Sequence, residues 1–271
     1  MTMKKNILFY DLETNGLDYY TTGIMQMCII DLDGNTILNQ YTYPFDKRID
    51  ATEIHGIDEK KLIDNNAITT YDLCIKVKSM IRNLFNREDV YLMSYNNFGF
   101  DQVILENNFK LCKLKIPDNW YFIDMFPIIK ELYPNIKPNY KLANIYKTLC
   151  DNENSINYHC ALADTKCLYE IFKKINTNNN YILDKYTRTS LFNDNILDSP
   201  ISSLYGYNNC FTLEQKGIFL IGDIYKVFKE NNNDNTIFES FLRNKIGIYS
   251  IFYIQNLIKQ INFIYYIKEN I

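Results

Sequence analysis

The sequence predicts an α/β domain with a mixed sheet, followed by a smaller helical segment. Three β-rich runs open the chain at residues 5–10, 24–31 and 36–43, and the Asp33-Gly34 turn between the last two is a strong hairpin signal. Helical and strand-like patterns then alternate as far as residue 175. Three antiparallel strands followed by alternating helices and strands are typical of an α/β domain, so the sheet should be mixed.

The elements of this first domain follow from the spacing of apolar residues. Residues 5–10 form a short apolar run that ends in an acid, which is typical of a buried strand. Residues 70–85 carry apolar side chains at a helical spacing, namely Leu73, Val77, Met80, Ile81 and Leu84. By the same criteria we expect strands at 90–94 and 121–123 and helices at 101–111, 140–149 and 161–175.

The chain beyond residue 175 has a different pattern. The polar run NTNNN at 176–180 predicts a linker, so we expect a first domain at 1–175 and a helical module at 181–271. Helices are expected at 223–228, 236–245 and 250–263; Thr236 and Glu239 have the spacing of a capping box, and Ser250 suits the start of the last helix. The module could dock to a replication protein or present a solvated charged face.

The composition excludes several classes of protein. The chain of 271 residues is 47% apolar and 23% charged, which argues against disorder, and its net charge of −3 argues against coating nucleic acid by bulk charge. Seven scattered Cys without a CxxC pair argue against a disulfide framework and a structural zinc site. We find no signal peptide, and polar residues interrupt the apolar stretch 246–267, so we expect an intracellular protein that is neither secreted nor membrane-spanning.

Two carboxylates stand at the end of the first predicted strand. Alternate residues of a strand face the same way, so Asp11 and Glu13 converge on one side of the sheet. Two acids in a buried position are costly unless a positive charge neutralises them, and Mg²⁺ prefers carboxylate oxygens. A turn cap at Asp11 and a solvated Glu13 are the alternative explanation for this motif alone.

Two further acids and a histidine occur at the starts of predicted helices. Asp101 ends the run NFGFD and opens a helix, and Asp164 lies in the first turn of another, five residues after His159. Helix capping or the helix dipole explains each acid taken alone, because Asp is favoured at both positions. Together, however, the residues occur in the order Asp-x-Glu, Asp, His-x4-Asp, which is a pattern of four acids and one histidine.

This pattern resembles the motifs of the DEDDh family of 3′→5′ exonucleases. FYDLETNGL is similar to the first motif of the family, NFGFD to the second and HCALADTKCLYEIF to the third. The spacings are similar to those of the proofreading epsilon subunit of bacterial DNA polymerase III. The resemblance covers residues 7–174 and includes three landmarks between the motifs: His55-Gly56-Ile57, Asp124 and Tyr140-Lys141-Leu142.

The resemblance implies an RNase H-like fold, with a five-stranded mixed sheet flanked by helices, and phosphodiester hydrolysis with two divalent ions, Mg²⁺ or Mn²⁺. Asp11 would bridge both ions, Glu13 and Asp164 would complete the shell of the first, and Asp101 would hold the second. His159 would be the general base for the attacking water, a task that suits imidazole because it titrates near neutral pH. The products would be nucleoside 5′-monophosphates.

Substrate contacts are implied for four residues, Leu12, Thr14, His55 and Asn97. The alternatives are core packing for Leu12, a hydrogen-bonded loop histidine at His55 and a turn-fixing role for Asn97. Asn15 replaces the Thr or Ala of many relatives beside the expected 3′ end of the substrate, which leaves the substrate preference open. The tyrosine branch of the family would have Tyr at the position of Cys160, so the histidine branch matches better.

We therefore expect a metal-dependent 3′→5′ exonuclease that acts on single-stranded DNA in replication, proofreading or repair. An exoribonuclease that trims RNA is the alternative, because no residue reveals how the 2′-OH would be sensed. A non-catalytic module that binds nucleic acid or a protein partner, and a structural subunit built around the helical segment, are further alternatives. The complete set of acids with His159 favours the enzyme.

Overall fold

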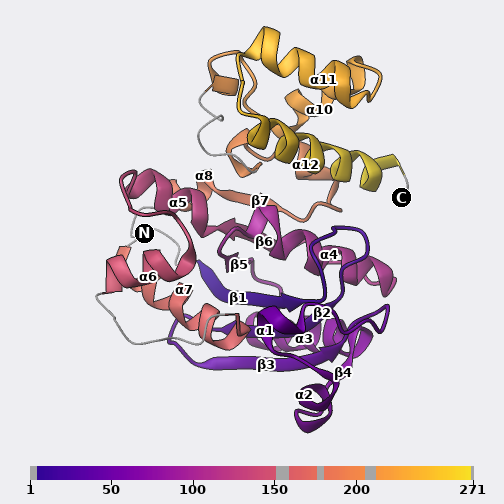
Figure 1. The fold of residues 1–271 in the computed structure, drawn as a ribbon, viewed down its shortest axis with the longest axis vertical. Helices are drawn as coiled ribbons and strands as arrows, with labels where there is room; N and C mark the ends of the chain where they lie inside the picture. The colour runs from indigo at the N-terminus through magenta and orange to yellow at the C-terminus, as the bar shows by residue number, and fades with distance from the viewer. Residues whose placement is uncertain (1–4, 151–158, 176–179, 205–211, 270–271) are drawn as a thin grey trace.

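A seven-stranded mixed sheet lies at the centre of the computed structural model, which describes residues 5–150, 159–175, 180–204 and 212–269 (Figure 1). The strand order across the sheet is β4-β3-β2-β1-β5-β6-β7. The strands are β1 (Asn6–Thr14), β2 (Ile24–Ile30), β3 (Thr36–Tyr43), β4 (Ile68–Thr69), β5 (Val90–Ser94), β6 (Trp120–Asp124) and β7 (Thr187–Thr189).

The sheet is antiparallel on one side of β1 and parallel on the other. β1 pairs with β2, and β2 with β3, in antiparallel fashion, whereas β5 pairs in parallel with both β1 and β6. The carboxyl ends of β1, β5 and β6 therefore meet at the same edge, and this edge is where α/β sheets usually carry their functional residues. Of the short edge strands, β4 is parallel to β3 and β7 is antiparallel to β6.

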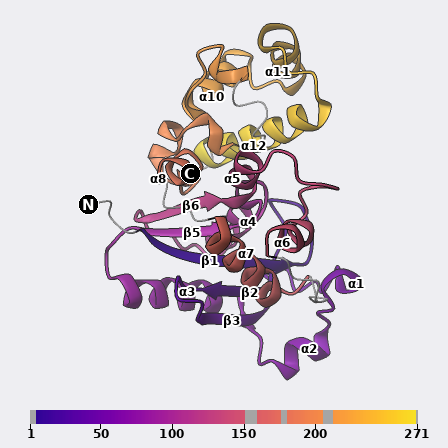
Figure 2. The same cartoon turned by 90° about the vertical axis from the view of Figure 1, so that its left-hand side faces the viewer.

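Helices cover both faces of the sheet (Figures 1 and 2). They are α1 (Thr52–His55), α2 (Glu59–Asp64), α3 (Thr70–Phe85), α4 (Asp101–Leu111), α5 (Met125–Leu132), α6 (Leu142–Cys150), α7 (Ala161–Ile175) and α8 (Asn180–Lys185). The 3-10 turn η1 (Asn97–Gly99) connects β5 to α4. The parallel pairs β1–β5 and β5–β6 are thus each joined through a helix, as α/β crossovers require.

The alternation of side chains along β1 assigns its residues to the two faces of the sheet. Leu8, Tyr10 and Leu12 belong to the hydrophobic cluster that contains residues of α3 and α4. Ile7 and Phe9 belong to a second cluster, with α5, α6 and α7. Because alternate residues share a face, Asp11 and Glu13 lie on the α7 side.

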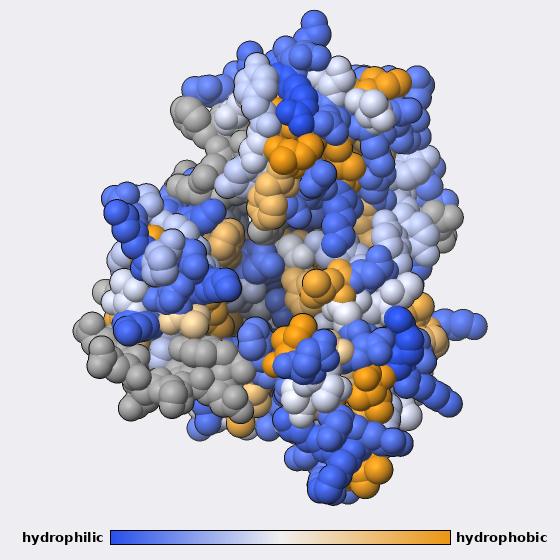
Figure 3. Space-filling view, viewed as in Figure 1, coloured by the Kyte–Doolittle hydropathy of each residue, from blue (hydrophilic) through white to orange (hydrophobic). Residues whose placement is uncertain are grey.

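The C-terminal segment packs on the first of these clusters. Its helical elements are η2 (Asp194–Asp198), η3 (Ile201–Ser203), α10 (Ile221–Glu230), α11 (Asn235–Phe241), the π-helical turn η4 (Leu242–Ile246) and α12 (Ile251–Glu269). The ring of Phe263 on α12 lies 5.7 Å, centroid to centroid, from the ring of Tyr19 in the loop after β1. One cluster of apolar residues therefore continues from the sheet into α12. The molecular surface is hollowed below the C-terminal segment on the face that Figure 3 shows.

The predicted α/β architecture is confirmed, and β3, β5, α3, α4 and α7 have the predicted bounds. The sheet has seven strands and not the expected five, because β4 and β7 contain two and three residues and are too short to show a periodic pattern. β1 is longer than predicted. It continues through both acids to Thr14 because its pairing with β2 continues that far.

Several details of the C-terminal segment differ from the predictions. Helix α10 extends from Ile221 to Glu230, and α12 continues to Glu269 rather than ending at residue 263. β7 follows the proposed linker yet belongs to the sheet, so the residues after 180 do not begin as a purely helical module; the division at 176–180 itself stays a prediction. The cap of α11 is Asp234 and not Thr236: the Asp234 carboxylate accepts the backbone N–H of Thr236 at 2.8 Å and of Ile237 at 3.0 Å. None of the helices in the described ranges combines the length and the hydropathy of a membrane span.

Candidate active site

Three carboxylates meet at the carboxyl end of β1. Asp11 and Glu13 come from β1, and Asp164 comes from the first turn of α7, which packs on the same face of the sheet. A carboxylate oxygen from each residue lies within 4.8 Å of those of the other two. Glu13 is buried and Asp11 is partly buried, so water alone does not neutralise this concentration of negative charge.

The fourth acid, Asp101, lies beside this group at the start of α4. Its side chain is 3% exposed, and one carboxylate oxygen accepts the backbone N–H of Leu12 at 3.2 Å. This hydrogen bond connects α4 to the peptide between the two acids of β1. Burial raises the pKa of Asp11, and the negative charge of Asp101 adds to this rise.

His159 lies directly before α7, at the border of the described residues. Its backbone N–H donates to a carboxylate oxygen of Asp164 at 3.0 Å, and its φ of 64° is in the left-handed region. The residue is exposed, unlike the acids beside it. The structure thus places the histidine next to the carboxylates, and the hydrogen bond made by its backbone orients Asp164.

Burial raises the pKa values of the clustered carboxyl groups, and their mutual repulsion adds to the rise. The pKa of Glu13 is raised to about 8, first by burial and then by Asp164 and Asp101, while Lys61 of α2 opposes this rise. Burial also raises the pKa of Asp101 to about 8, although the N–H of Leu12 acts against it. The pKa of Asp11 is raised well above its usual range, again mainly by burial.

This donor set fits a divalent cation. Carboxylate oxygens are the ligands that Mg²⁺ and Mn²⁺ prefer. Burial, together with the nearby acids, raises the pKa values of Asp11, Glu13 and Asp101, so their ionised forms are poorly stabilised without a cation. A bound cation would favour the ionised forms and remove the cost of their burial. Asp11, Glu13 and Asp164 can together hold a metal ion.

The raised pKa values predict that the metal-free protein loses stability as the pH rises. An acid with a raised pKa in the folded state holds its proton there while the unfolded chain has already released it, so stability falls until the pH passes the folded pKa. Between pH 6.5 and 8.0, Glu13 and Asp101 should each cost roughly 2 kcal/mol, which lowers the melting temperature in EDTA by several degrees. Burial lowers the pKa of His55, so this residue changes the stability of the protein mainly below pH 6.5.

Calorimetry in EDTA and in Mg²⁺ checks this expectation. Saturating Mg²⁺ should remove most of the fall, since a bound cation displaces the protons at all these pH values. Glu13→Gln removes one of the raised groups and should reduce the slope in EDTA. A melting temperature that stays constant or rises from pH 6.5 to 8.0 in EDTA would contradict the electrostatics described here.

Asn97 and His55 have roles within the protein rather than at an exposed surface. Asn97 has no exposed surface, and its amide nitrogen donates to the carbonyls of Leu92 at 3.1 Å and Ile123 at 2.8 Å. These bonds favour the turn-fixing alternative, and the substrate contact stays a prediction. The two ring nitrogens of His55 lie 3.0 Å from the backbone N–H of Ile57 and 3.2 Å from the carbonyl of Asp50. His55 is thus engaged by its own loop, and a substrate contact would compete with these bonds.

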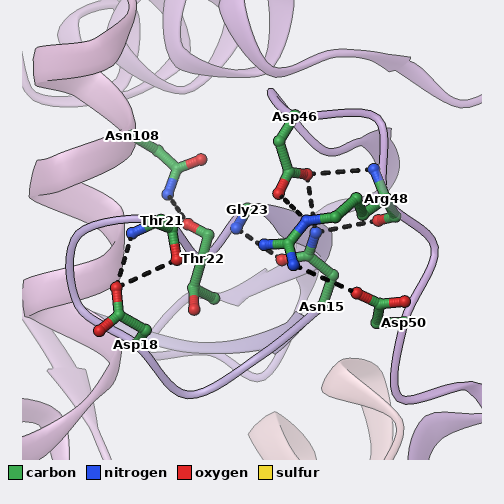
Figure 4. A network of polar contacts seen from close by, with 9 residues as sticks. All are labelled: Asn15, Asp18, Thr21, Thr22, Gly23, Asp46, Arg48, Asp50 and Asn108. Carbon is green, nitrogen blue, oxygen red and sulfur yellow. Dashed lines mark hydrogen bonds and ion pairs between the residues drawn. The ribbon is translucent and has the colours of Figure 1, made fainter.

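Leu12, Thr14 and Asn15 line the end of β1. Leu12 is a member of the core cluster, and the Thr14 hydroxyl donates to the carbonyl of Gly16 at 2.9 Å; their substrate contacts stay predictions. The Asn15 amide nitrogen donates to Asp46 and to the Arg48 carbonyl, both at 2.9 Å, and its oxygen accepts from Gly23 (Figure 4). Asn15 therefore fixes the loop beside the expected 3′ end.

A buried polar network behind the acids is not evident from the sequence. Arg188 of β7 is 1% exposed and lies near Glu106 of α4 and Asp124 of β6, whose charges favour its ionised form. Burial lowers the pKa of Arg188 to about 10, so the guanidinium stays charged at neutral pH. The motifs mark Asp124 only as a landmark, and nothing in the local pattern around Arg188 marks it as buried.

A mixed sheet flanked by helices, with carboxylates gathered at the end of its central strand, is the arrangement of the RNase H-like fold class. Residues 8–172 match the model of the RNase T family of exonucleases, so the chain belongs to this exonuclease family. The curated relative DPD1 of Arabidopsis thaliana, a chloroplastic/mitochondrial exonuclease, is 26% identical over 182 residues, which are 62% of this chain and 55% of DPD1.

Solved structures of E. coli exonuclease I show the same fold. The zinc-bound complex with single-stranded DNA is 21% identical with a TM-score of 0.54, and the complex with a dA16 oligonucleotide is 22% identical with a TM-score of 0.53. Each match covers 67% of this chain and 42% of the other. The chain spans about half the length of these relatives or less.

Proposed function

We propose that this protein is a metal-dependent 3′→5′ exonuclease that removes nucleoside 5′-monophosphates from single-stranded DNA. The observation that carries the proposal is the meeting of Asp11, Glu13 and Asp164, with carboxylate oxygens within 4.8 Å of one another and pKa values raised by burial. A fixed cluster of unneutralised carboxylates costs stability, and a metal-dependent hydrolase is the function that such a cluster supports best.

Two divalent ions are proposed, with a shared ligand. Asp11, Glu13 and Asp164 would hold one of them, and Asp101, with Asp11, would hold the other. When bound, the ions would neutralise the charge of the scissile phosphate and lower the pKa of the attacking water. The N–H of Leu12 and the N–H of His159 orient the carboxylates of Asp101 and Asp164 toward this task.

His159 would accept the proton of the attacking water on its imidazole ring. Its exposure leaves the ring free to approach a substrate, and its position directly before α7 keeps it next to Asp164. The left-handed backbone at His159 is an uncommon conformation for a residue other than glycine. Strained residues of this kind often occur where a side chain must be aimed at a site.

Single-stranded DNA is preferred over RNA because E. coli exonuclease I, which shares the fold, has been solved with single-stranded DNA oligonucleotides. RNA trimming remains the second candidate. Asn15, whose amide is fully engaged by the loop, offers no evident donor for the 2′-OH that distinguishes the two sugars.

Degradation of matched single-stranded DNA and RNA oligonucleotides tests the proposal. Strands labelled at the 5′ end should shorten progressively in Mg²⁺ or Mn²⁺, with faster loss of DNA, and should stay intact in EDTA. Strands labelled at the 3′ end should release labelled mononucleotide at once. Faster loss of RNA would favour the trimming function, and progressive shortening from the 5′ end would overturn the polarity.

A further inference from the structure

Arg188 lies at the centre of a buried network that joins three parts of the chain. Its Nε donates to the Gln102 side chain on α4 at 2.6 Å, and its Nη1 donates to the Gln260 side chain on α12 at 3.2 Å. Its Nη2 donates to the carbonyl of Phe98 in η1 at 3.2 Å. The planar fork of a guanidinium suits such divergent contacts, which a lysine could not all make.

Two opposite charges hold the turn that precedes Asp101. Arg188 binds the carbonyl of Phe98, and Asp124 accepts the N–H of the same residue at 3.1 Å. The guanidinium carbon also lies 4.2 Å from the centre of the Phe98 ring, at a distance typical of a cation–π contact. The backbone before the turn is unusual, because Asn96 has a φ of 62° in the left-handed region, and these tertiary contacts help to hold it.

The residue after Asp101 is fixed by the same network. Gln102 accepts from Arg188 and donates to Glu106 at 2.8 Å and to the carbonyl of Thr189 at 3.1 Å. The hydrogen bonds of Gln102 therefore fix the first turn of α4, while the Asp101 carboxylate accepts the N–H of Leu12. A shift of Phe98 or Gln102 would move Asp101 relative to Asp11.

We propose that Arg188 is a positioning residue for Asp101 and that it connects helix α12 to the acidic cluster through Gln260. The inference rests on the proposed function, because Asp101 is one of the residues that would hold the metal ions of the proposed reaction. Gln260 is 4% exposed, so its hydrogen bond to Arg188 forms away from water. The C-terminal segment thereby contributes to the site although the family match ends at residue 172.

Gln260→Leu and Arg188→Lys test this connection in the full-length chain. The full chain is needed because removing the residues after 180 would delete β7 from the sheet. Asn256→Leu is the matched control, since it removes an amide from the same helix whose nitrogen donates to the carbonyl of Phe252. The measurements are kcat and KM on a single-stranded oligonucleotide, the Mg²⁺ concentration for half-maximal rate, and the affinity for Mn²⁺ without substrate.

Both test variants should lower kcat by roughly 10-fold and weaken Mn²⁺ binding by a similar factor, at the lower end of the effects known for outer-shell partners of metal ligands. KM for the oligonucleotide should change by less than about twofold, because no contact to the substrate is removed. Arg188→Lys should retain more activity than Arg188→Met. The control should match the wild-type protein in both kcat and Mn²⁺ affinity.

A lower melting temperature with unchanged kcat and Mn²⁺ affinity in the folded variants would overturn the proposal, since it would show a purely structural role. Equal impairment of Asn256→Leu and Gln260→Leu would overturn it as well. Mn²⁺ binding is measured without nucleic acid, so it tests the positioning of Asp101 even if the wild-type protein degrades no oligonucleotide. Failure of the proposed function is thus distinguishable from failure of this inference.

Discussion

Asp11→Asn is expected to lower the rate of nucleotide release by more than about 10⁴-fold, exceeding the roughly 10²- to 10⁴-fold effect of losing a general base. Asp11 is the residue whose carboxylate interacts with those of Glu13, Asp101 and Asp164. Its loss would remove the ligand that both proposed ions share. Single-turnover release of mononucleotide from labelled DNA in Mg²⁺ measures the effect.

The folded state should tolerate Asp11→Asn. The substitution keeps the shape of the side chain and removes a carboxyl group whose ionised form is disfavoured by burial and by the neighbouring acids, so the melting temperature in EDTA should be equal to or above that of the wild-type protein. Asp33→Asn is the matched control, because Asp33 is exposed in the hairpin at the opposite end of β1. Retention of more than about 1% of the rate by Asp11→Asn would contradict its role as the shared ligand.

His159→Ala should lower the rate by about 10²- to 10⁴-fold, the usual range for a lost general base. The loss should appear in kcat rather than in KM, because the ring is proposed to accept the proton in the chemical step. Mg²⁺ dependence should change little, because His159 meets Asp164 through its backbone N–H, which alanine also has.

Added imidazole provides a second check on His159. The residue is exposed, so a free imidazole molecule could enter the space left by the missing ring and restore part of the rate of His159→Ala. The restored rate should increase with the concentration of the neutral form. A loss of less than about threefold in His159→Ala would mean that another group accepts the proton.

The motif residues could be predicted because their positions depend on the local periodicity of strands and helices. Asp11 and Glu13 lie on the same face of a strand, Asp101 opens α4, and Asp164 lies in the first turn of α7. Such placements depend on the periods of strands and helices, which a sequence displays directly. The parallel pairing of β1 with β5 then brings the strand end and the helix start together.

Arg188 could not be predicted from the sequence, and Asn97 could be named but its contacts could not. Arg188 is buried by contacts with residues 72 to 90 positions away, and its strand has three residues, so no local pattern could reveal it. Asn97 belongs to a motif that suggested a substrate contact, yet its amide bonds the carbonyls of Leu92 and Ile123 from two neighbouring strands. Long-range hydrogen bonds of this kind depend on the assembled sheet.

The start of α11 illustrates a smaller difference. Thr236 and Glu239 have the spacing of a capping box, but Asp234 lies two residues earlier and its carboxylate accepts two backbone N–H groups. Asp and Thr are both favoured as caps, so the pattern alone could not choose between the two starts. The correction shifts the helix by one turn or less and leaves the active site unaffected.

The most direct test of the central claim is to locate Mn²⁺ in crystals by anomalous diffraction at the manganese edge. We expect one peak bound by Asp11, Glu13 and Asp164, and a second beside Asp11 on the side of Asp101. Crystals of Asp11→Asn grown in the same way should lose the second peak and weaken the first. No anomalous density near the four carboxylates at millimolar Mn²⁺ would contradict the metal-dependent mechanism.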